Sequence, residues 1–417
     1  MTSPRLPVDA AIARIMEALP APLGEQVAIR DTPGRVLLQD IDARYTHPAW
    51  RNSAMDGYAM RACDVRGASA DSPIQLPVHG TIAAGDAAPA AIVPGSAWRI
   101  MTGASVPDDM DTVVRVEDTD AGLVDVVIRS DRDAGRNIRP RGEDFAAGQR
   151  LLSHGTLLRA PHVALAAANG CSSLTVARRP RVAILGSGNE LVDVDQFEDV
   201  LAGRRIINSN GYALAAAVED AGGIAIDLGI ARDDPAAIAA HITSAPPFDV
   251  LVTCGGISVG AFDYTRDVVH RLGATLDFWR VRMRPGGPFG FGMLQQRPWF
   301  GLPGNPVSAL VTFEVFVRPA LRQMGAVPHA FRETVAVTLA DAVTTSGGLT
   351  HFLRAVVDAD RVAHLTGPQG SGLLTSMVAA NALLIVPHDV SYLAAGAAAR
   401  AVLLQPAQPQ MTVPWNF

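Results

Sequence analysis

The stretch that most constrains the fold runs from residue 249 to 266 and reads DVLVTCGGISVGAFDYTR. Its apolar run at 250–252 contains β-branched residues and predicts a buried strand. Glycines follow at 255, 256 and 260, and a helix is expected to begin near residues 263–266. Such a turn exposes backbone N–H groups, and its missing Cβ atoms let a phosphate approach closely. The stretch therefore predicts an anion-binding turn in an α/β domain, although an ordinary strand-to-helix turn has the same pattern.

Two side chains in this turn indicate which anion it would bind. Ser258 adds a hydroxyl, and Asp263 adds a carboxylate that would repel a phosphate unless a cation lay between them. Together they favour a phosphorylated ligand bound with a hard metal ion. Residues 256–260 also match the G-x-S-x-G pattern of a serine hydrolase. That class stays open as an alternative, but nothing in the sequence marks His270 or His351 as its histidine.

From residue 181 to about residue 328 the chain alternates short strands with helices, which predicts a parallel sheet covered on both faces. Gly186, Ser187 and Gly188 follow the first of these strands and begin like a dinucleotide-binding fingerprint, but Leu191 stands at the third glycine position. Ligands of such sheets bind beyond the carboxyl ends of the strands. We therefore expect residues 186–190, Asp233 and the glycine turn to share one rim of the sheet.

Composition excludes several classes of protein. The net charge of -6 argues against a general nucleic-acid-binding surface. All 35 basic residues are arginine, so neither a P-loop with its lysine nor a Schiff-base mechanism is possible. The three cysteines form no C-x-x-C pair, and no stretch reads as a signal peptide or a membrane span. A cytoplasmic protein that binds neither nucleic acid nor membranes is expected.

Two regions outside the α/β pattern read as β structure. Residues 72–130 and 329–417 alternate short strands with glycine and proline. Helical spacing appears at 8–19 and again within 148–178, and residues 306–319 are expected to form a helix that ends near Pro319. The segment RNIRPRGEDF at 136–145 is either a solvated charged loop or an anion site beside a metal-binding carboxylate.

Six motifs stand in a fixed order over nearly the whole chain. They are NSAMDGYAM at 52–60, T-G-A-x-V-P at 102–107, R-x-R-G-E-D at 139–144, G-S-G-N-E-L at 186–191, GGISVGAFDYT at 255–265 and GLPGNPVSA at 301–309. In this order they resemble the molybdopterin molybdenumtransferase family of the MoeA type, which includes the C-terminal domain of gephyrin. Residues 374–387 resemble that family's last domain.

The resemblance implies a multidomain α/β and β fold. A three-layer α/β/α molybdopterin-binding domain is expected at 180–328 and a C-terminal β barrel at 329–417. An inserted β domain at 46–147 would interrupt an elongated dimerisation domain made of residues 1–45 and 148–179. The family's site is shared across a homodimer, between the α/β domain of one subunit and the inserted domain of the other.

The resemblance also implies a reaction. The family binds adenylylated molybdopterin, cleaves its adenylate with Mg²⁺, and inserts molybdate to give molybdenum cofactor and AMP. Contact with other molybdenum cofactor synthesis proteins is a further expectation. Two alternatives stay open, namely a non-catalytic paralogue or scaffold of the same fold and a molybdopterin adenylyltransferase.

The resemblance implies site residues position by position. The catalytic set is Asp56, Thr102, Asp144, Glu190, Asp233 and Asp263, of which Glu190 and Asp263 would hold the metal. The substrate-binding set is Gly186, Ser187, Gly188, Gly255, Gly256, Ser258, Gly260, Arg280, Arg284, Pro303, Gly304, Asn305 and Arg354.

The chain departs from the family at the expected oxyanion site. The family's lysines near Trp279 are replaced by Arg280 and Arg284, and Gly287 stands where the family has the lysine of P-G-K-P. Arginine keeps the charge but changes the geometry of contact. If residues 280–284 form one strand, Arg280, Arg282 and Arg284 should point to one face. The missing cation at 287 predicts weaker molybdate binding unless another arginine compensates.

Overall fold

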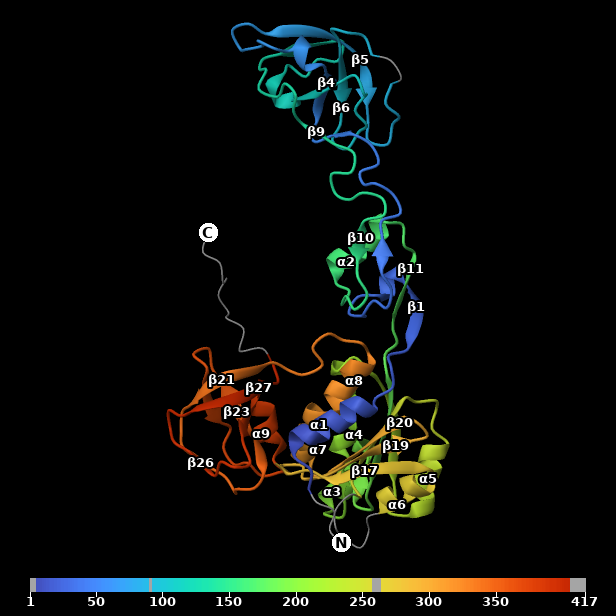
Figure 1. Cartoon of the computed structure of the whole chain (residues 1–417), viewed down its shortest axis with the longest axis vertical. Helices are drawn as coiled ribbons and strands as arrows, with labels where there is room; N and C mark the ends of the chain where they lie inside the picture. Colours follow the sequence, from blue (N-terminus) through green and yellow to red (C-terminus); the bar gives the residue numbers. More distant parts are fainter. Residues whose placement is uncertain (1–4, 90–91, 257–263, 406–417) are drawn as a thin grey trace.

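The computed structural model describes residues 5–89, 92–256 and 264–405. The molecule is elongated (Figure 1). An α/β unit and a β barrel lie side by side at one end, a narrow two-segment connector occupies the middle, and a small β unit lies at the far end. None of the helices in these described ranges is long and apolar enough to cross a membrane.

A six-stranded sheet in the order β15-β12-β16-β20-β19-β17 forms the centre of the α/β unit. Its strands are β12 (Arg181–Ser187), β15 (Ile224–Ala231), β16 (Val250–Cys254), β17 (Ala274–Arg280), β19 (Pro288–Leu294) and β20 (Arg297–Leu302). The first four in the sheet order are parallel, as predicted, whereas β19 pairs antiparallel with both β20 and β17. The sheet is therefore mixed, because β19 and β20 form a hairpin through Gln295 and Gln296, which have φ of 51° and 66°.

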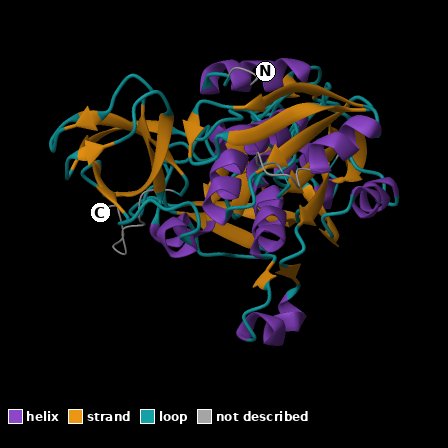
Figure 2. Ribbon diagram, turned by 90° about the horizontal axis from the view of Figure 1, so that it is seen from below, coloured by secondary structure: helices purple, strands orange, loops and turns teal. Residues whose placement is uncertain are grey.

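Helices cover both faces of this sheet, as the alternation predicted (Figure 2). The helices are α1 (Val8–Ala18), α4 (Ser209–Asp220), α5 (Pro235–Thr243), α6 (Tyr264–Arg271), α7 (Pro306–Thr312) and α8 (Arg318–Met324). One face packs against Ile15 of α1 and Leu214 of α4, and the other against Ile238 of α5 and Val268 of α6. Asp234 caps α5 by accepting a 2.8 Å hydrogen bond from the N–H of Ala237.

The helix that begins at Pro306 does not end near Pro319, so that prediction was wrong. A π-helical turn at Phe313–Val317 follows α7, and α8 then continues to Met324. Pro319 lies in the first turn of α8, where a residue without an N–H breaks no intrahelical hydrogen bond. The change of hydrogen-bond register in the π turn lets the chain pass the proline and remain helical.

The far β unit is a five-stranded sheet in the order β7-β4-β6-β5-β8. Its strands are β4 (Gly57–Met60), β5 (Ile74–Ile82), β6 (Ala97–Ile100), β7 (Thr112–Arg115) and β8 (Asp125–Ile128), with a separate pair formed by β3 (Asn52–Ser53) and β9 (Ile138–Arg139). The prediction of a small β unit between residues 72 and 130 is confirmed. It also includes β4, which begins at Gly57, directly after Asp56.

The connector consists of the two chain segments that flank this β unit. Strands β1 (Gly24–Ala28) and β11 (Ser173–Ala177) pair antiparallel, as do β2 (Ile41–Asp42) and β10 (Arg150–Leu152). Helical spacing was expected within residues 148–178, and the helix that the structure shows there is α2 (Ala160–Ala168). The rest of that segment contains β10, β11 and turns, and in β11 mostly buried side chains alternate with half-buried ones.

The C-terminal unit is a closed barrel of five strands, β23-β24-β21-β27-β25, in which β25 returns to pair with β23. The strands are β21 (Thr334–Leu339), β23 (Thr350–Val357), β24 (Val362–Leu365), β25 (Ala382–Val386) and β27 (Ala398–Leu403). The short strand β18 (Met283–Arg284), which follows β17, pairs with β23. The barrel is therefore joined to the α/β unit by main-chain hydrogen bonds.

Candidate functional site

The carboxyl ends of the four parallel strands form one rim, and the glycines predicted for it lie together. A Cβ atom on Gly255 would lie 2.5 Å from the carbonyl oxygen of Ser187, and one on Gly304 would lie 3.7 Å from the Cα of Gly255. Gly255 and Gly256 have φ of 94° and 64°, a region that disfavours side chains. The sequence prediction that these loops share a rim is confirmed for its described residues.

Two asparagines fix this rim and were missed in the sequence analysis. The side-chain amide of Asn210 donates a 2.7 Å hydrogen bond to the carbonyl of Gly304. The side chain of Asn208 accepts one of 3.2 Å from the N–H of Gly211, and its amide would lie 3.1 Å from a Cβ on Gly186. The pattern N-S-N at the start of a helix was the available signal, since asparagine caps helices and bonds loop carbonyls.

Two of the predicted carboxylates lie at the same rim. Asp233 accepts a 3.1 Å hydrogen bond from the N–H of Asn189, and the N–H of Asp233 donates one of 3.2 Å to the side chain of Asn189. The carboxylate of Glu190 folds back over the loop, so that a Cβ on Gly188 would lie 2.8 Å from both of its oxygens. The turn after β12 and the loop before α5 are thereby held together.

The carboxylates described at the rim could bind Mg²⁺ only if a substrate phosphate supplied further oxygen ligands. Within the described ranges, no group of three His, Cys, Asp or Glu side chains comes close enough to hold a metal ion. Mg²⁺ commonly binds one or two protein carboxylates together with water and substrate phosphate, and the exposed carboxylate of Glu190 meets that requirement. The predicted partners Ser258, Gly260 and Asp263 lie outside the described residues.

Asp56 and Thr102 form a local pair in the far β unit. The N–H and the hydroxyl of Thr102 both donate to Oδ1 of Asp56, over 2.7 and 2.8 Å. The backbone hydrogen bond first and the hydroxyl second lower the pKa of Asp56 below its ordinary value. Asp56 is therefore an exposed carboxylate held ionised and in one orientation.

A single chain does not bring all the predicted carboxylates together. Asp56 and Thr102 lie at the far end of the molecule, on the unit that contains β4 and β6, whereas Glu190 and Asp233 lie at the opposite end beside α5 (Figure 1). Asp144 lies at the junction of the connector and the β unit, where its N–H donates a 3.1 Å hydrogen bond to the carbonyl of His47. The described carboxylates of one chain therefore do not form a single site.

A cavity of about 570 Å³ opens next to the rim and concentrates positive charge. It is lined by Arg5, Arg280, Met283, Arg284, Pro285, Gly286, Gly287, Pro288, Ser308, Leu349, Gln369, Gly370 and Ser371. No carboxylate is among these described lining residues. Ser308 comes from α7, directly after the Pro303–Asn305 turn, so the cavity adjoins the glycine rim. We call it the arginine cavity.

Arg282 does not share a face with Arg280 and Arg284, so that expectation was wrong. Between β17 and β18 the chain forms a parallel bridge from Val281 to Leu6, which interrupts the strand. The simple alternation of side chains does not continue through this interruption. Arg282 instead lines a second cavity, on the other side of the segment.

Arg354, which was predicted to bind the substrate, is not at the surface of the arginine cavity. Its side chain is fully buried and does not line the arginine cavity. Its guanidinium donates to the hydroxyl of Ser376 over 3.1 Å and to the carbonyls of Pro368, Gln369 and Gly370 over 3.2, 3.2 and 3.0 Å. Arg354 therefore holds the 368–370 loop, part of which lines the cavity.

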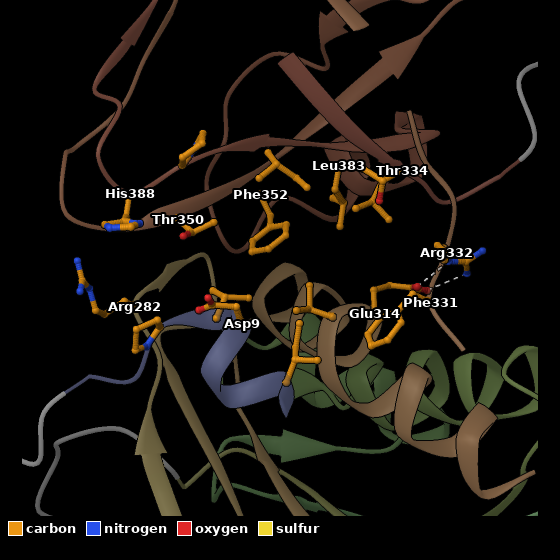
Figure 3. A pocket seen from close by; sticks show the side chains of 17 residues that line it. Asp9, Arg282, Glu314, Phe331, Arg332, Thr334, Thr350, Phe352, Leu383 and His388 are labelled. Atoms are coloured by element: carbon orange, nitrogen blue, oxygen red, sulfur yellow. Dashed lines mark hydrogen bonds and ion pairs between the residues drawn. The ribbon is translucent and has the colours of Figure 1, made fainter. Parts of the chain in front are cut away.

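The second cavity, of about 580 Å³, lies between α1 and the barrel and is mostly apolar (Figure 3). Phe352 and Leu383 face it from the barrel, and Asp9 and Glu314 face it from the α/β unit. Its Arg332 is already paired with Glu314, with 2.7 Å between Nε and Oε2. Because it contains two carboxylates, this cavity suits an anionic substrate less well than the arginine cavity does.

Comparisons with known proteins cover most of the chain. Residues 6–170 match the model of the MoeA N-terminal region (domain I and II). Residues 183–323 match the model of a probable molybdopterin binding domain, and residues 336–404 match the MoeA C-terminal region (domain IV). A "Molybdopterin molybdenumtransferase 2" from Mycobacterium tuberculosis is 40% identical over 377 residues, which is 89% of this chain and 92% of that protein.

The chain belongs to the molybdopterin molybdenumtransferase (MoeA) family. A MoeA family member from Bacillus subtilis, named molybdopterin molybdenumtransferase, is 34% identical over 415 residues, covering 96% of this chain and 94% of its own length. A crystal structure of the molybdopterin biosynthesis moeA protein from Pyrococcus horikoshii has 30% identity and a TM-score of 0.80, and it covers 96% of this chain and 100% of that one. These matches confirm the resemblance and the fold expected from it.

Cys254 of this MoeA family member lies at the end of β16 and is no candidate nucleophile. Complete burial raises the pKa of its thiol to about 12, against a smaller opposing effect of the Asn210 amide. The thiol donates to the carbonyl of Pro303 over 3.3 Å. Cys254 therefore ties β16 to the Pro303–Asn305 turn.

Arg5 is a charged lining residue of the arginine cavity that the sequence analysis missed. It lies in the N-terminal segment, far in sequence from Arg280 and Arg284. No motif surrounds it, so only the tertiary structure reveals its position.

Proposed function

We propose that this protein catalyses the family's reaction, in which adenylylated molybdopterin and molybdate give molybdenum cofactor and AMP. The observation that carries the proposal is the arginine cavity, which adjoins a glycine-lined rim at the carboxyl ends of parallel strands. A substrate with a phosphate group and a separate oxyanion needs two such neighbouring anion sites. The curated relatives named molybdopterin molybdenumtransferase support the same reaction.

The proposal assigns roles to the rim. Residues 186–188 and 255–256, four of which are glycines without a Cβ atom, would let the phosphate of the substrate approach the rim closely, with Pro303, Gly304 and Asn305 closing the site. Ser258 and Gly260 would extend the same glycine loop. Ser258 would donate a hydrogen bond to the ligand, so a fluorophosphonate probe should leave it unlabelled.

The metal of the proposed reaction is Mg²⁺, held by Glu190 and Asp263 together with the substrate's phosphate. When bound, it would neutralise charge on the phosphate that leaves with AMP. Asp233 fixes the loop that carries Asn189 and thereby the position of Glu190. Arg280 and Arg284 would hold the molybdate oxygens, with Arg354 maintaining the loop behind them.

The proposed enzyme is a homodimer with a composite site. Asp56, Thr102 and Asp144 lie on or beside the unit farthest from the rim, and a second subunit would supply them there. The boundaries 46–147, 180–328 and 329–417, and a discontinuous dimerisation domain at 1–45 and 148–179, are part of this proposal. So are a cytoplasmic location and contact with other molybdenum cofactor synthesis proteins.

The test is to incubate the protein with adenylylated molybdopterin, molybdate and Mg²⁺ and to measure AMP release. We expect AMP release that depends on both molybdate and Mg²⁺ and falls strongly in Arg284→Gln. Binding of the substrate without AMP release would instead identify a non-catalytic scaffold. Formation of adenylylated molybdopterin from ATP and molybdopterin would identify an adenylyltransferase.

A further inference from the structure

The N-terminal segment is fixed against the arginine cavity by its backbone. The N–H of Leu6 donates a 3.0 Å hydrogen bond to the carbonyl of Arg280, and the N–H of Arg282 donates one of 2.8 Å to the carbonyl of Leu6. The side chain of Leu6 packs against the main core cluster, and α1 begins two residues later. The main chain at Leu6, next to Arg5, is therefore held by two hydrogen bonds to the 280–282 segment, and Arg5 lines the cavity beside it.

Among the residues that the structure describes, none balances the positive charges around the cavity. Arg5, Arg280 and Arg284 line one space of about 570 Å³, and no described residue forms an ion pair with any of them. Other arginines behave differently, because Arg332 pairs with Glu314, and Arg115 pairs with Asp133 over 2.9 Å. Three neighbouring guanidinium groups repel one another unless an anion lies between them. An anion with more than one negative charge is the ligand that such a group selects.

Position 287 of the same cavity has no charge. Gly286 has φ of 93°, and a Cβ there would lie 2.3 Å from the Thr312 side chain, so glycine is required at 286. Gly287 lacks that constraint, and a Cβ there would lie 3.1 Å from the Met283 carbonyl. Arg5 and Gly287 line the same cavity, so Arg5 brings a positive charge from another part of the chain to a space in which position 287 supplies none.

We infer that Arg5 is a third binding residue for a tetrahedral oxyanion dianion, acting with Arg280 and Arg284 in the arginine cavity. This inference rests on the proposed function, because molybdate is the dianion that the reaction consumes. Arg5 supplies the positive charge that position 287 lacks. The N-terminal segment is thereby part of the binding site as well as of the fold.

Arg282 provides a matched control within the same structure. It has the same side chain, and its main chain bonds the same residue, Leu6, but it lines the other cavity. Loss of a general positive charge, or of packing around Leu6, should affect Arg5→Gln and Arg282→Gln alike. Loss of an oxyanion contact should affect Arg5→Gln alone.

The experiment measures molybdate and tungstate binding to the full-length protein by calorimetry, and AMP release against molybdate concentration at saturating adenylylated molybdopterin. We expect Arg5→Gln to raise the Kd of both oxyanions and the KM for molybdate by roughly 10- to 100-fold, the range for losing one charge-assisted hydrogen bond. Arg5→Lys should show a smaller increase. Binding of adenylylated molybdopterin should change less than about twofold, as should all three measurements in Arg282→Gln.

A rescue variant adds a second criterion. Gly287→Lys placed in the Arg5→Gln protein should restore oxyanion binding to within a few-fold of the native value, because it returns one positive charge to the same cavity. Native-like oxyanion binding in Arg5→Gln, or an equal loss in Arg282→Gln, would overturn the inference while leaving the proposed function intact. Failure of the native protein to release AMP or to bind either oxyanion would instead contradict the proposed function itself.

Discussion

The close approach of two loops at Gly255 predicts how strongly an alanine at that position destabilises the protein. Gly255 and Gly273 have nearly the same left-handed backbone, with φ of 94° and 95°. A Cβ on Gly273 would meet nothing within 4 Å, whereas one on Gly255 would lie 2.5 Å from the Ser187 carbonyl oxygen. Alanine at each position therefore carries the same backbone strain, and only Gly255→Ala adds a collision between two loops of the rim.

The two costs can be separated. Alanine in the left-handed region costs about 1–2 kcal/mol, and this applies to both variants. The collision at Gly255 requires the Ser187 backbone to move by roughly half an ångström or more, and overpacking of this kind costs about 1–3 kcal/mol. Gly255→Ala should therefore be less stable than Gly273→Ala by about 1–3 kcal/mol.

The assay is urea unfolding of both variants and the native protein, with AMP release measured on the folded enzymes. Gly273→Ala should keep native activity, and Gly255→Ala should bind adenylylated molybdopterin more weakly because the displaced Ser187 backbone is part of the proposed binding rim. Equal destabilisation of the two variants, or native substrate affinity in Gly255→Ala, would refute the close approach of the loops and its role.

Three further predictions concern the metal, a pKa and the assembly. Glu190→Ala should lower AMP release by roughly 10²–10³-fold without unfolding the protein, and full activity in excess chelator would contradict the metal's role. Thr102→Val should raise the pKa of Asp56, measured by carboxyl NMR, towards its ordinary value but not fully, because the backbone bond remains; Thr102→Ser is the control. The bonds to the Asp56 carboxylate contribute stability above its unfolded pKa, and this contribution is lost as pH falls through the lowered folded pKa. Mixed dimers of Asp56→Ala and Asp263→Ala should regain activity, and no recovery after verified subunit exchange would argue against a shared site.

Much of the α/β unit could be predicted because its signals are local. The buried strand at 250–254, the Asp234 cap before Pro235 and the glycines after β16 each follow from neighbouring residues. Parallel strands then place their carboxyl ends together without further information, which is why residues far apart in sequence were expected at one rim.

The remaining features depend on contacts between distant segments. The bridge of Leu6 to Val281 interrupts the strand and sends Arg282 away from Arg280 and Arg284, and nothing near residue 281 in the sequence signals it. Arg354 has the residue type of an anion ligand, yet its donors bond loop carbonyls that only the folded barrel brings near it. Arg5 reaches the cavity for the same reason, since its position depends on the bridge beside it.

The position of a bound oxyanion tests most directly whether the arginine cavity is the oxyanion-binding site. Crystals of the protein soaked in tungstate should show one strong anomalous tungsten peak inside the arginine cavity, between the guanidinium groups of Arg5, Arg280 and Arg284. This peak should disappear in Arg284→Gln and weaken in Arg5→Gln, while Arg282→Gln should keep it. A tungsten peak elsewhere on the protein, with the arginine cavity empty at the same tungstate concentration, would show that the three arginines do not form the oxyanion site.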